Sequence, residues 1–218
     1  MSATDPLLEG LNPQQQDAVA YAGGPLLVVA GAGSGKTRVL TRRIAYLMAR
    51  RNVNPYEILA ITFTNKAAGE MKERVTELVG PIAKSMWVST FHSACVRLLR
   101  QEVERLGYSS SFSIYDSADS QKLIQKVCES LNLDSKRYPA RQFQNIISNA
   151  KNELQTPYEF LSAATNQFDT IAADVYTMYE KRLKQANALD FDDLIMKTVE
   201  VLQKFPEAKA RFRSRFRH

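Results

Sequence analysis

The segment from Ala30 to Thr37, AGAGSGKT, has the residue types and spacing of a phosphate-binding loop. Glycines at positions 31, 33 and 35 allow backbone N–H groups to turn inward around an anion. The helix expected after the loop adds the positive end of its dipole. In such a loop Lys36 reaches the β and γ phosphates of a nucleotide, and the Thr37 hydroxyl ligates Mg²⁺. The segment therefore predicts a nucleoside triphosphate site.

The loop departs from the strict motif G-x-x-x-x-G-K-[ST] at one position, where this chain has Ala30 instead of glycine. Alanine is nearly as small, so we keep the interpretation; the alternative is a glycine-rich turn without a ligand. We predict Lys36 and Thr37 as catalytic residues, Thr37 as the metal ligand, and ATP and Mg²⁺ as cofactors. The predicted cofactor-binding residues of this segment are Ala30, Gly31, Ala32, Gly33, Ser34, Gly35, Lys36, Thr37 and Arg38. For Arg38, as for Arg42 one turn later, solvated surface charge is the alternative.

Alternating strands and helices are expected around this loop. Near-continuous apolar runs predict buried parallel strands, and periodic apolar residues predict helices. The predicted strands cover 26–30, 58–64 and 86–90, and the predicted helices cover about 36–50, 66–79 and 91–105. A short helix capped by Asn12, with Pro13 at its first position, precedes them. The alternation predicts an α/β fold built on a doubly wound parallel sheet.

Helical periodicity takes over after Gly107, and we expect no strands there. Apolar stripes predict a compact helical subdomain over about 111–188. Asp190 then has the character of an N-cap for one more helix. The stripes comprise Leu123, Ile124, Val127 and Leu131; Phe143, Ile146, Ile147 and Ala150; and Ile171, Val175, Met178, Tyr179 and Leu183. In the last helix Leu194, Ile195, Val199 and Leu202 are expected to be buried.

Composition gives weaker constraints. The 218 residues carry a formal net charge of +6, which favours a polyanionic partner only slightly. Cys95 and Cys128 stand apart from other metal-ligating residues, so we predict neither a disulfide framework nor a zinc site. No apolar stretch approaches the roughly 18 residues needed to span a bilayer, and the N-terminus lacks the pattern of a signal peptide. We therefore expect a cytoplasmic protein without a membrane partner.

A second motif, TFTNKAAGEM over 62–71, narrows the class of nucleotide-binding protein. With it come LNPQQQDAV at 11–19, WVSTFHSACVRLLR at 87–100, AKNEL at 150–154 and LDFDDLI at 189–195. Together with the phosphate-binding loop, these segments closely resemble the UvrD/PcrA/Rep group of superfamily 1 DNA helicases, in order and across nearly the whole chain. TFTNKAAGEM and TFHS are highly specific to that group, whereas the phosphate-binding loop is generic.

The resemblance implies a RecA-like P-loop NTPase domain interrupted by an all-helical insertion. In the terms of the family, residues 1–110 are the first part of ATP-binding domain 1A, and residues 111–188 are subdomain 1B. Residues 189–218 return to domain 1A. This division agrees with the change of periodicity near Gly107.

The resemblance also implies roles for individual residues. Gln15 is at the position of the glutamine that bonds the adenine edge. Gln16 is the alternative if the register differs by one residue, and a solvated glutamine without a ligand is the other alternative. Phe63 ends a strand and could stack on an unpaired base, although a core phenylalanine is the common alternative. The predicted DNA-binding residues are Phe63, Thr64, Asn65, Lys66, Thr90 and His92. A structural histidine is the alternative for His92.

Charged residues of the helical part admit two interpretations. Lys136, Arg137, Arg141, Lys151 and Lys181 could cradle DNA, but a solvated basic face explains them equally well. Asp192 and Asp193 could pair at a metal. Their place just inside a helix N-terminus favours capping and dipole roles.

One segment expected for a complete helicase motor is absent. The family takes its Mg²⁺ carboxylate and its water-orienting carboxylate from a DExx segment, which this sequence lacks. We therefore expect the N-terminal part of a longer helicase that moves 3′ to 5′ on single-stranded DNA and unwinds junctions with duplex during repair or replication. Its missing partners would be the C-terminal helicase domains, and this part alone would hydrolyse ATP negligibly. The alternatives are a binding or interaction module, and another P-loop enzyme such as a nucleotide kinase.

Overall fold

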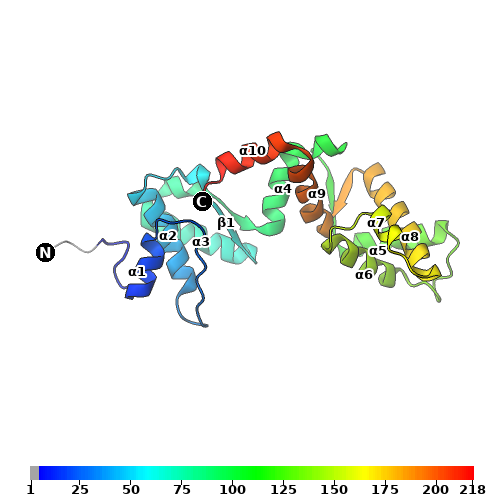
Figure 1. Ribbon diagram of the computed structural model, residues 1–218, viewed down its shortest axis with the longest axis horizontal. Coiled ribbons are helices and arrows are strands. Elements are labelled where there is room, and N and C mark those ends of the chain that lie inside the picture. Colours follow the sequence, from blue (N-terminus) through cyan, green and yellow to red (C-terminus); the bar gives the residue numbers. More distant parts are fainter. Residues whose placement is uncertain (1–4) are drawn as a thin grey trace. The chain divides into compact units, whose positions relative to one another are not determined.

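The computed structural model describes residues 5–218, in which helices dominate and the strands are short and parallel (Figure 1). The chain divides into two compact units. The first unit comprises the residues up to Ala94 together with Ala210–His218, and the second comprises Cys95–Lys209. Because each unit has its own core, we describe each by itself.

The first unit packs helices on a two-stranded sheet. It contains α1 (Pro13–Ala20), α2 (Lys36–Arg50), β1 (Leu59–Thr62), α3 (Asn65–Val79) and β2 (Trp87–Thr90), with 3₁₀ turns at Pro55–Glu57 and Pro81–Ser85. β1 and β2 run parallel, with Leu59 opposite Trp87 and Thr62 opposite Thr90. The core joins α2, α3 and β1 through Ile44, Ile58, Ala60, Met71, Val75, Ala83 and Met86, and the partly buried Val88 of β2 packs against it. The helices and these two strands were predicted within a few residues.

Local sequence explains where these helices begin. Asn12 and Gln15 form a reciprocal capping box at the start of α1, and Pro13 occupies its first position. The Thr64 hydroxyl accepts the N–H of Ala67 at 3.1 Å and caps α3. α2 instead follows Gly35, whose φ of 82° few other residues adopt.

The prediction of a strand over residues 26–30 is wrong. That segment has no regular secondary structure and pairs with no described strand, and Leu27 and Val29 are 86% and 88% exposed. A groove of about 590 Å³ lies beside it, lined by Gly23–Pro25, by Leu40, Arg43, Ile44 and Leu47 of α2, by Ile58–Ile61, and by Arg217 and His218. An apolar run indicates that a segment can be buried in a sheet, but a strand also needs a hydrogen-bonded neighbour.

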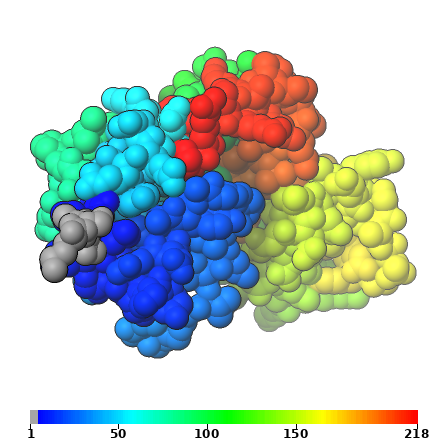
Figure 2. All heavy atoms as spheres, turned by 60° about the vertical axis from the view of Figure 1, so that its left-hand side comes forward, coloured from blue at the N-terminus to red at the C-terminus, as the bar shows by residue number. Residues whose placement is uncertain are grey.

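The last residues of the chain lie against the sheet of the first unit. The backbone N–H of Leu59 donates to the carbonyl of His218 at 2.8 Å, and the N–H groups of Arg217 and His218 donate to Glu57. The Phe216 ring lies 4.9 Å from the Trp87 ring, measured between centroids. Figure 2 shows these C-terminal residues, in red, against the cyan segment around residue 57.

The second unit is mainly helical, as predicted. Its helices are α5 (Ser117–Ser130), α6 (Ala140–Asn152), α7 (Pro157–Ser162), α8 (Gln167–Gln185) and α9 (Phe191–Lys204). α4 (Phe91–Glu102) begins in the first unit and continues into the second, where the 3₁₀ turn Val103–Leu106 follows, and α10 (Pro206–Arg215) runs back. The predicted stripes meet in one core, whose fully buried members include Ile124, Phe143, Val175, Tyr179 and Leu183.

Two expectations for this part of the chain are wrong. Strands do occur after Gly107: β3 (Ser113–Tyr115) and β4 (Ala188–Asp190) form a short parallel pair. Three residues are too few to show a periodic apolar pattern, and the partner of each strand is distant in the sequence. Ile195 is 38% exposed rather than buried, although its neighbour Leu194 is fully buried.

Candidate nucleotide and DNA-contact sites

The loop from Ala30 to Gly35 has the conformation that its glycines permit. Gly33 and Gly35 have φ of 74° and 82°, in the left-handed region. A Cβ placed on Gly31 or Gly33 would meet no atom within 4 Å, so the space beside them is open. The Lys36 ammonium folds back over the loop, donating to the carbonyls of Ala30 at 3.0 Å and Gly31 at 2.7 Å. The ammonium therefore lies beside the open loop, and an anion bound there could accept its hydrogen bonds in place of the two carbonyls.

Gln15 lies against this loop, and Gln16 does not. The amide nitrogen of Gln15 donates to the Ser34 carbonyl at 3.0 Å. The amide nitrogen of Gln16 donates to the carbonyls of Leu8 at 3.3 Å and Leu11 at 2.9 Å, within the N-terminal segment. Of the two registers considered from the sequence, the structure places Gln15 beside the loop.

The two arginines that follow the loop differ in their surroundings. Arg38 is exposed, and its guanidinium lies close to Gly10, where a Cβ would come within 2.8 Å of Nη2. Arg42 donates to the carbonyl of Pro6 at 2.7 Å and so anchors the N-terminal segment. Arg38 therefore remains available at the surface near the loop, whereas Arg42 has a structural partner.

Thr37, the predicted metal ligand, is exposed at the second residue of α2. Its hydroxyl oxygen is of the hard donor type that Mg²⁺ prefers, and Mg²⁺ commonly takes its remaining ligands from phosphates and water. Among residues 5–218 no group of three or more His, Cys, Asp or Glu side chains is placed to hold a metal by itself. The residues present thus fit a metal that arrives with a nucleotide, and not an independent metal centre.

The predicted DNA-contact residues follow the carboxyl ends of the two paired strands. Because Thr62 lies opposite Thr90, the segments that begin at Phe63 and Phe91 start side by side at one edge of the sheet. Phe63 is 94% exposed, so the alternative of a core phenylalanine is excluded. Asn65 and Lys66 are also exposed, and His92 is half-buried on α4. Ligands of parallel sheets bind at this end of the strands.

The two threonines of this edge already have structural roles. The Thr64 hydroxyl caps α3, as described above. The Thr90 hydroxyl donates to the Ser93 hydroxyl at 2.9 Å and accepts the Ser93 N–H at 3.3 Å, which caps α4. Both side chains therefore fix the helices that follow the strands, and their hydroxyls keep only part of their bonding capacity for a ligand.

Comparisons with known proteins give the same assignment as these motifs. Residues 11–218 match the family model described as the UvrD/REP helicase N-terminal domain. The chain belongs to this family. It is 59% identical to the ATP-dependent DNA helicase UvrD1 of Mycobacterium tuberculosis over the whole chain. It is 52% identical to the ATP-dependent DNA helicase PcrA of Bacillus subtilis, and 49% identical to that of Staphylococcus aureus, over 97% of the chain. The chain spans 29% of the length of each of these relatives.

The predicted DNA-binding residues leave out one exposed aromatic residue of this sheet edge, Phe91. Phe91 follows β2 directly, as Phe63 follows β1, and its side chain is 52% exposed. The signal was present, since any aromatic residue just after a predicted parallel strand shares the ligand-binding edge. The resemblance places Thr90-Phe91-His92 at the same edge as Phe63, in a second DNA-contact motif, although Phe91 is not among the predicted DNA-binding residues.

Lys151 neither cradles DNA nor belongs to a solvated basic face, the two roles considered from the sequence, because its side chain is fully buried. Its ammonium lies 2.6 Å from Glu180 Oε1, 2.7 Å from Asp190 Oδ2 and 2.9 Å from Asp193 Oδ1. The Tyr179 hydroxyl also donates to Asp190, at 2.9 Å. We call these five residues the lysine cluster. Lys136, Arg137, Arg141 and Lys181 are exposed, as both earlier interpretations required.

Burial and like charges set the protonation of the lysine cluster. Burial, reinforced by Glu180 and Asp190, raises the pKa of Asp193 to about 7 despite the adjacent Lys151. The pKa of Asp190 is lowered: burial opposes ionisation, but Lys151, the Asp193 N–H and Tyr179 outweigh it. Three surrounding carboxylates, led by Asp193, overcome desolvation and hold the pKa of Lys151 well above 10.5.

Asp193, the second residue of the acidic pair after Asp190, takes part in capping the helix. Asp190 Oδ1 accepts the Asp193 N–H at 2.8 Å, and Asp193 Oδ2 accepts the Asp190 N–H at 3.1 Å. This capping box starts α9. Asp193 is thus both a cap and a member of the lysine cluster, which the AKNEL and LDFDDLI motifs bring together.

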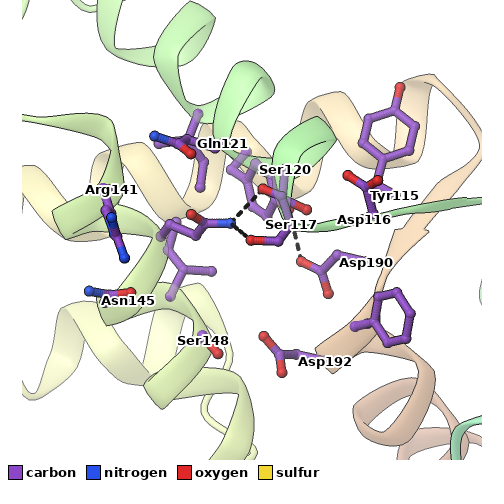
Figure 3. Close-up of a pocket in the computed structure, with 15 residues that line it drawn as sticks. Tyr115, Asp116, Ser117, Ser120, Gln121, Arg141, Asn145, Ser148, Asp190 and Asp192 are labelled. Atoms are coloured by element: carbon purple, nitrogen blue, oxygen red, sulfur yellow. Dashed lines mark hydrogen bonds between the residues drawn. The ribbon is translucent and has the colours of Figure 1, made fainter.

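A hollow of about 630 Å³ adjoins the lysine cluster in the second unit. Figure 3 shows Asp190 and Asp192 on one side of it and Arg141 and Asn145 on the other. Phe191 also lines it and is 50% exposed. Sequence reasoning did not identify this hollow, because its walls come from α5, α6, α8 and the β4–α9 junction.

Two further expectations concern cysteines and membranes. Cys95 and Cys128 are free thiols, and burial raises the pKa of each. Among the helices of residues 5–218, none combines the length and the apolar character that a membrane crossing requires.

Proposed function

We propose that this chain is the ATP-binding and DNA-contacting part of a helicase of the UvrD/REP family, built on a RecA-like P-loop domain. The observation that carries the proposal is the loop before α2, with left-handed Gly33 and Gly35 and a Lys36 ammonium folded over it. ATP would bind with its phosphates at this loop, its β and γ oxygens taking over Lys36 from the two carbonyls. Mg²⁺, bound with the nucleotide, would neutralise phosphate charge, and Thr37 would hold it.

Single-stranded DNA would run along the carboxyl edge of β1 and β2. Phe63 offers an exposed ring for stacking, and Asn65 and Lys66 offer donors for phosphate oxygens. In the whole protein we expect ATP hydrolysis to drive movement 3′ to 5′ and unwinding at single-strand/duplex junctions. The second candidate function is a binding module that holds ATP and single-stranded DNA without hydrolysis, and the absence of a DExx segment favours it for this chain alone.

Replacing Lys36 tests the nucleotide site. Lys36→Ala removes the only side-chain cation that folds over the loop in the described structure, and charge-assisted hydrogen bonds contribute about 1.5–3 kcal/mol. We expect ATP affinity, measured by isothermal titration calorimetry with Mg²⁺, to fall about 10- to 150-fold. Lys84→Ala, an exposed lysine before the amino end of β2, is the matched control. Equal ATP binding by all three proteins would show that the loop is not the nucleotide site.

Replacing Phe63 tests the DNA path. Base stacking is worth about 1–3 kcal/mol per base, so Phe63→Ala should weaken binding of a labelled single-stranded oligonucleotide about 5- to 150-fold. Tyr56→Ala provides the control, because Tyr56 is 56% exposed but precedes the amino end of β1. Fluorescence anisotropy at two salt concentrations would separate stacking from phosphate contacts. If both variants bind like the parent, the DNA path lies elsewhere.

A further inference from the structure

Gln15 joins the start of α1 to the phosphate-binding loop through both ends of its amide. Its oxygen accepts the backbone N–H of Asn12 at 3.0 Å, and its nitrogen donates to the Ser34 carbonyl at 3.0 Å. A backbone N–H can only donate and a carbonyl can only accept, so the amide has one orientation that satisfies both partners. The side chain is therefore fixed at both ends before any nucleotide arrives.

The contact at Ser34 also determines a backbone direction within the loop. In a planar trans peptide, the Ser34 carbonyl and the Gly35 N–H point in opposite directions. Because Gln15 holds the carbonyl, the Gly35 N–H is directed away from Gln15. Gly35 itself is close by, since a Cβ placed on it would lie 3.4 Å from Gln15 Nε2. The Ser34 hydroxyl donates to the Gly31 carbonyl at 2.7 Å and closes the turn.

We propose that Gln15 is a positioning residue of the phosphate-binding loop, acting on phosphate binding through the Ser34 carbonyl whatever base the nucleotide carries. This inference rests on the proposed ATP site and goes beyond the adenine contact that the family resemblance implies. One side chain with a second amide N–H and a free oxygen lone pair can serve both purposes. The base and the phosphates would then be sensed by the same group.

Inorganic tripolyphosphate, which has no base, separates the two roles of Gln15. Loss of one hydrogen bond of ordinary strength corresponds to about a 2- to 10-fold change in affinity. We expect Gln15→Ala to weaken tripolyphosphate, ATP and GTP by a common factor in that range. Gln14→Ala, from the exposed neighbouring glutamine, should change none of them. Asn12→Ala removes the other half of the capping box and leaves the Ser34 contact in place, so it controls for a loosened α1.

Each result has a definite meaning. Unchanged tripolyphosphate binding with weakened ATP binding would overturn the proposal and leave only the adenine role. If tripolyphosphate is too weak to measure, equal losses for ATP and GTP support the proposal, and a loss confined to ATP overturns it. If the parent protein binds neither ATP nor GTP, the proposed nucleotide site fails instead.

Hydrogen–deuterium exchange of the nucleotide-free protein gives a second, independent measurement. The peptide covering residues 31–36 should exchange faster in Gln15→Ala than in Asn12→Ala or the parent, because the Ser34–Gly35 peptide loses its anchor. Equal exchange in all three proteins would overturn the proposal, whatever the binding data show.

Discussion

The two compact units place their charged and polar groups in opposite ways. In the first unit the groups with potential function lie at the surface: Phe63 is 94% exposed, and the phosphate-binding loop is exposed along most of its length. In the second unit the densest group of charges, the lysine cluster, is almost completely buried. Surface groups can meet a ligand without rearrangement, whereas buried charges hold segments together. The difference indicates that the first unit is organised for binding and the second unit for internal order.

Removing the buried lysine should have the largest effect, and it should be confined to the second unit. Lys151→Met leaves three acidic side chains without their shared cation, and breaking a buried pair costs about 3–5 kcal/mol. Urea unfolding followed by circular dichroism should show that loss, with Lys181→Met, an exposed lysine of α8, as the control. Trp87, the only tryptophan, lies in the first unit, and its fluorescence transition should not move. A loss below about 1 kcal/mol would mean that the cluster only offsets its own desolvation.

The second effect in size is a pH dependence of the second unit. The pKa of Asp193 is raised from 3.8 to about 7, so the folded state binds one proton more than the unfolded state between these values. Stability should therefore fall as pH rises from about 5 to 7, by at most about 1.4 kcal/mol per pH unit. Lys151, Glu180 and Asp190 act on the Asp193 carboxyl, and Lys197, Tyr108 and Tyr176 also interact with it electrostatically.

The groups around Asp193 whose pKa is shifted titrate outside that window. The pKa values of Asp190 and Glu200 are lowered, so these groups change stability only below pH 3.8 and pH 4.5. The pKa values of Lys151 and Lys197 are raised, so these groups change stability only above pH 10.5. Both histidines of the chain, His92 and His218, belong to the first unit. Asp193→Asn should thus abolish the slope, measured as urea midpoints at several pH values. A slope that persists in this variant would assign the proton to another group.

The smallest expected effect belongs to the first unit. Thr64→Ala removes the cap of α3, which typically costs about 1 kcal/mol. The Trp87 fluorescence transition should shift accordingly, while the exchange of peptides from α8 should not change. Thr64→Ser keeps the hydroxyl and should retain most of the stability. A loss of 3 kcal/mol or more would show that surface and buried groups contribute alike, and would remove the contrast between the units.

Features of the fold that depend on residues close together in the sequence were predictable. Asn12 and Asp190 were predicted as helix caps from the sequence, because capping depends on residues within one turn. The helical stripes of the second unit also correspond to its core, since α-helical periodicity is repeated over several turns. The loop at 30–37 was predicted to bind phosphate from eight consecutive residues, which is also a local signal.

Features that depend on distant partners were not predictable. The burial of Lys151 requires Glu180, Asp190 and Asp193 to meet it from other elements, and a lysine by itself indicates an exposed position. The β3–β4 pair joins three-residue segments that are more than seventy residues apart. The unpaired segment at 26–30 is the converse case, in which composition indicated a strand and no described neighbour supplied the hydrogen bonds.

The open side of β1 has a practical consequence for handling this chain. Beyond the bond from Leu59 to His218, no described strand pairs with that side of β1, and the groove beside it is lined by apolar side chains such as Leu40, Ile44 and Leu47. Unpaired strand backbone beside apolar side chains is a template for pairing between molecules. We expect concentrated solutions to self-associate reversibly, and low protein concentration to be the condition under which binding constants of single molecules are measured.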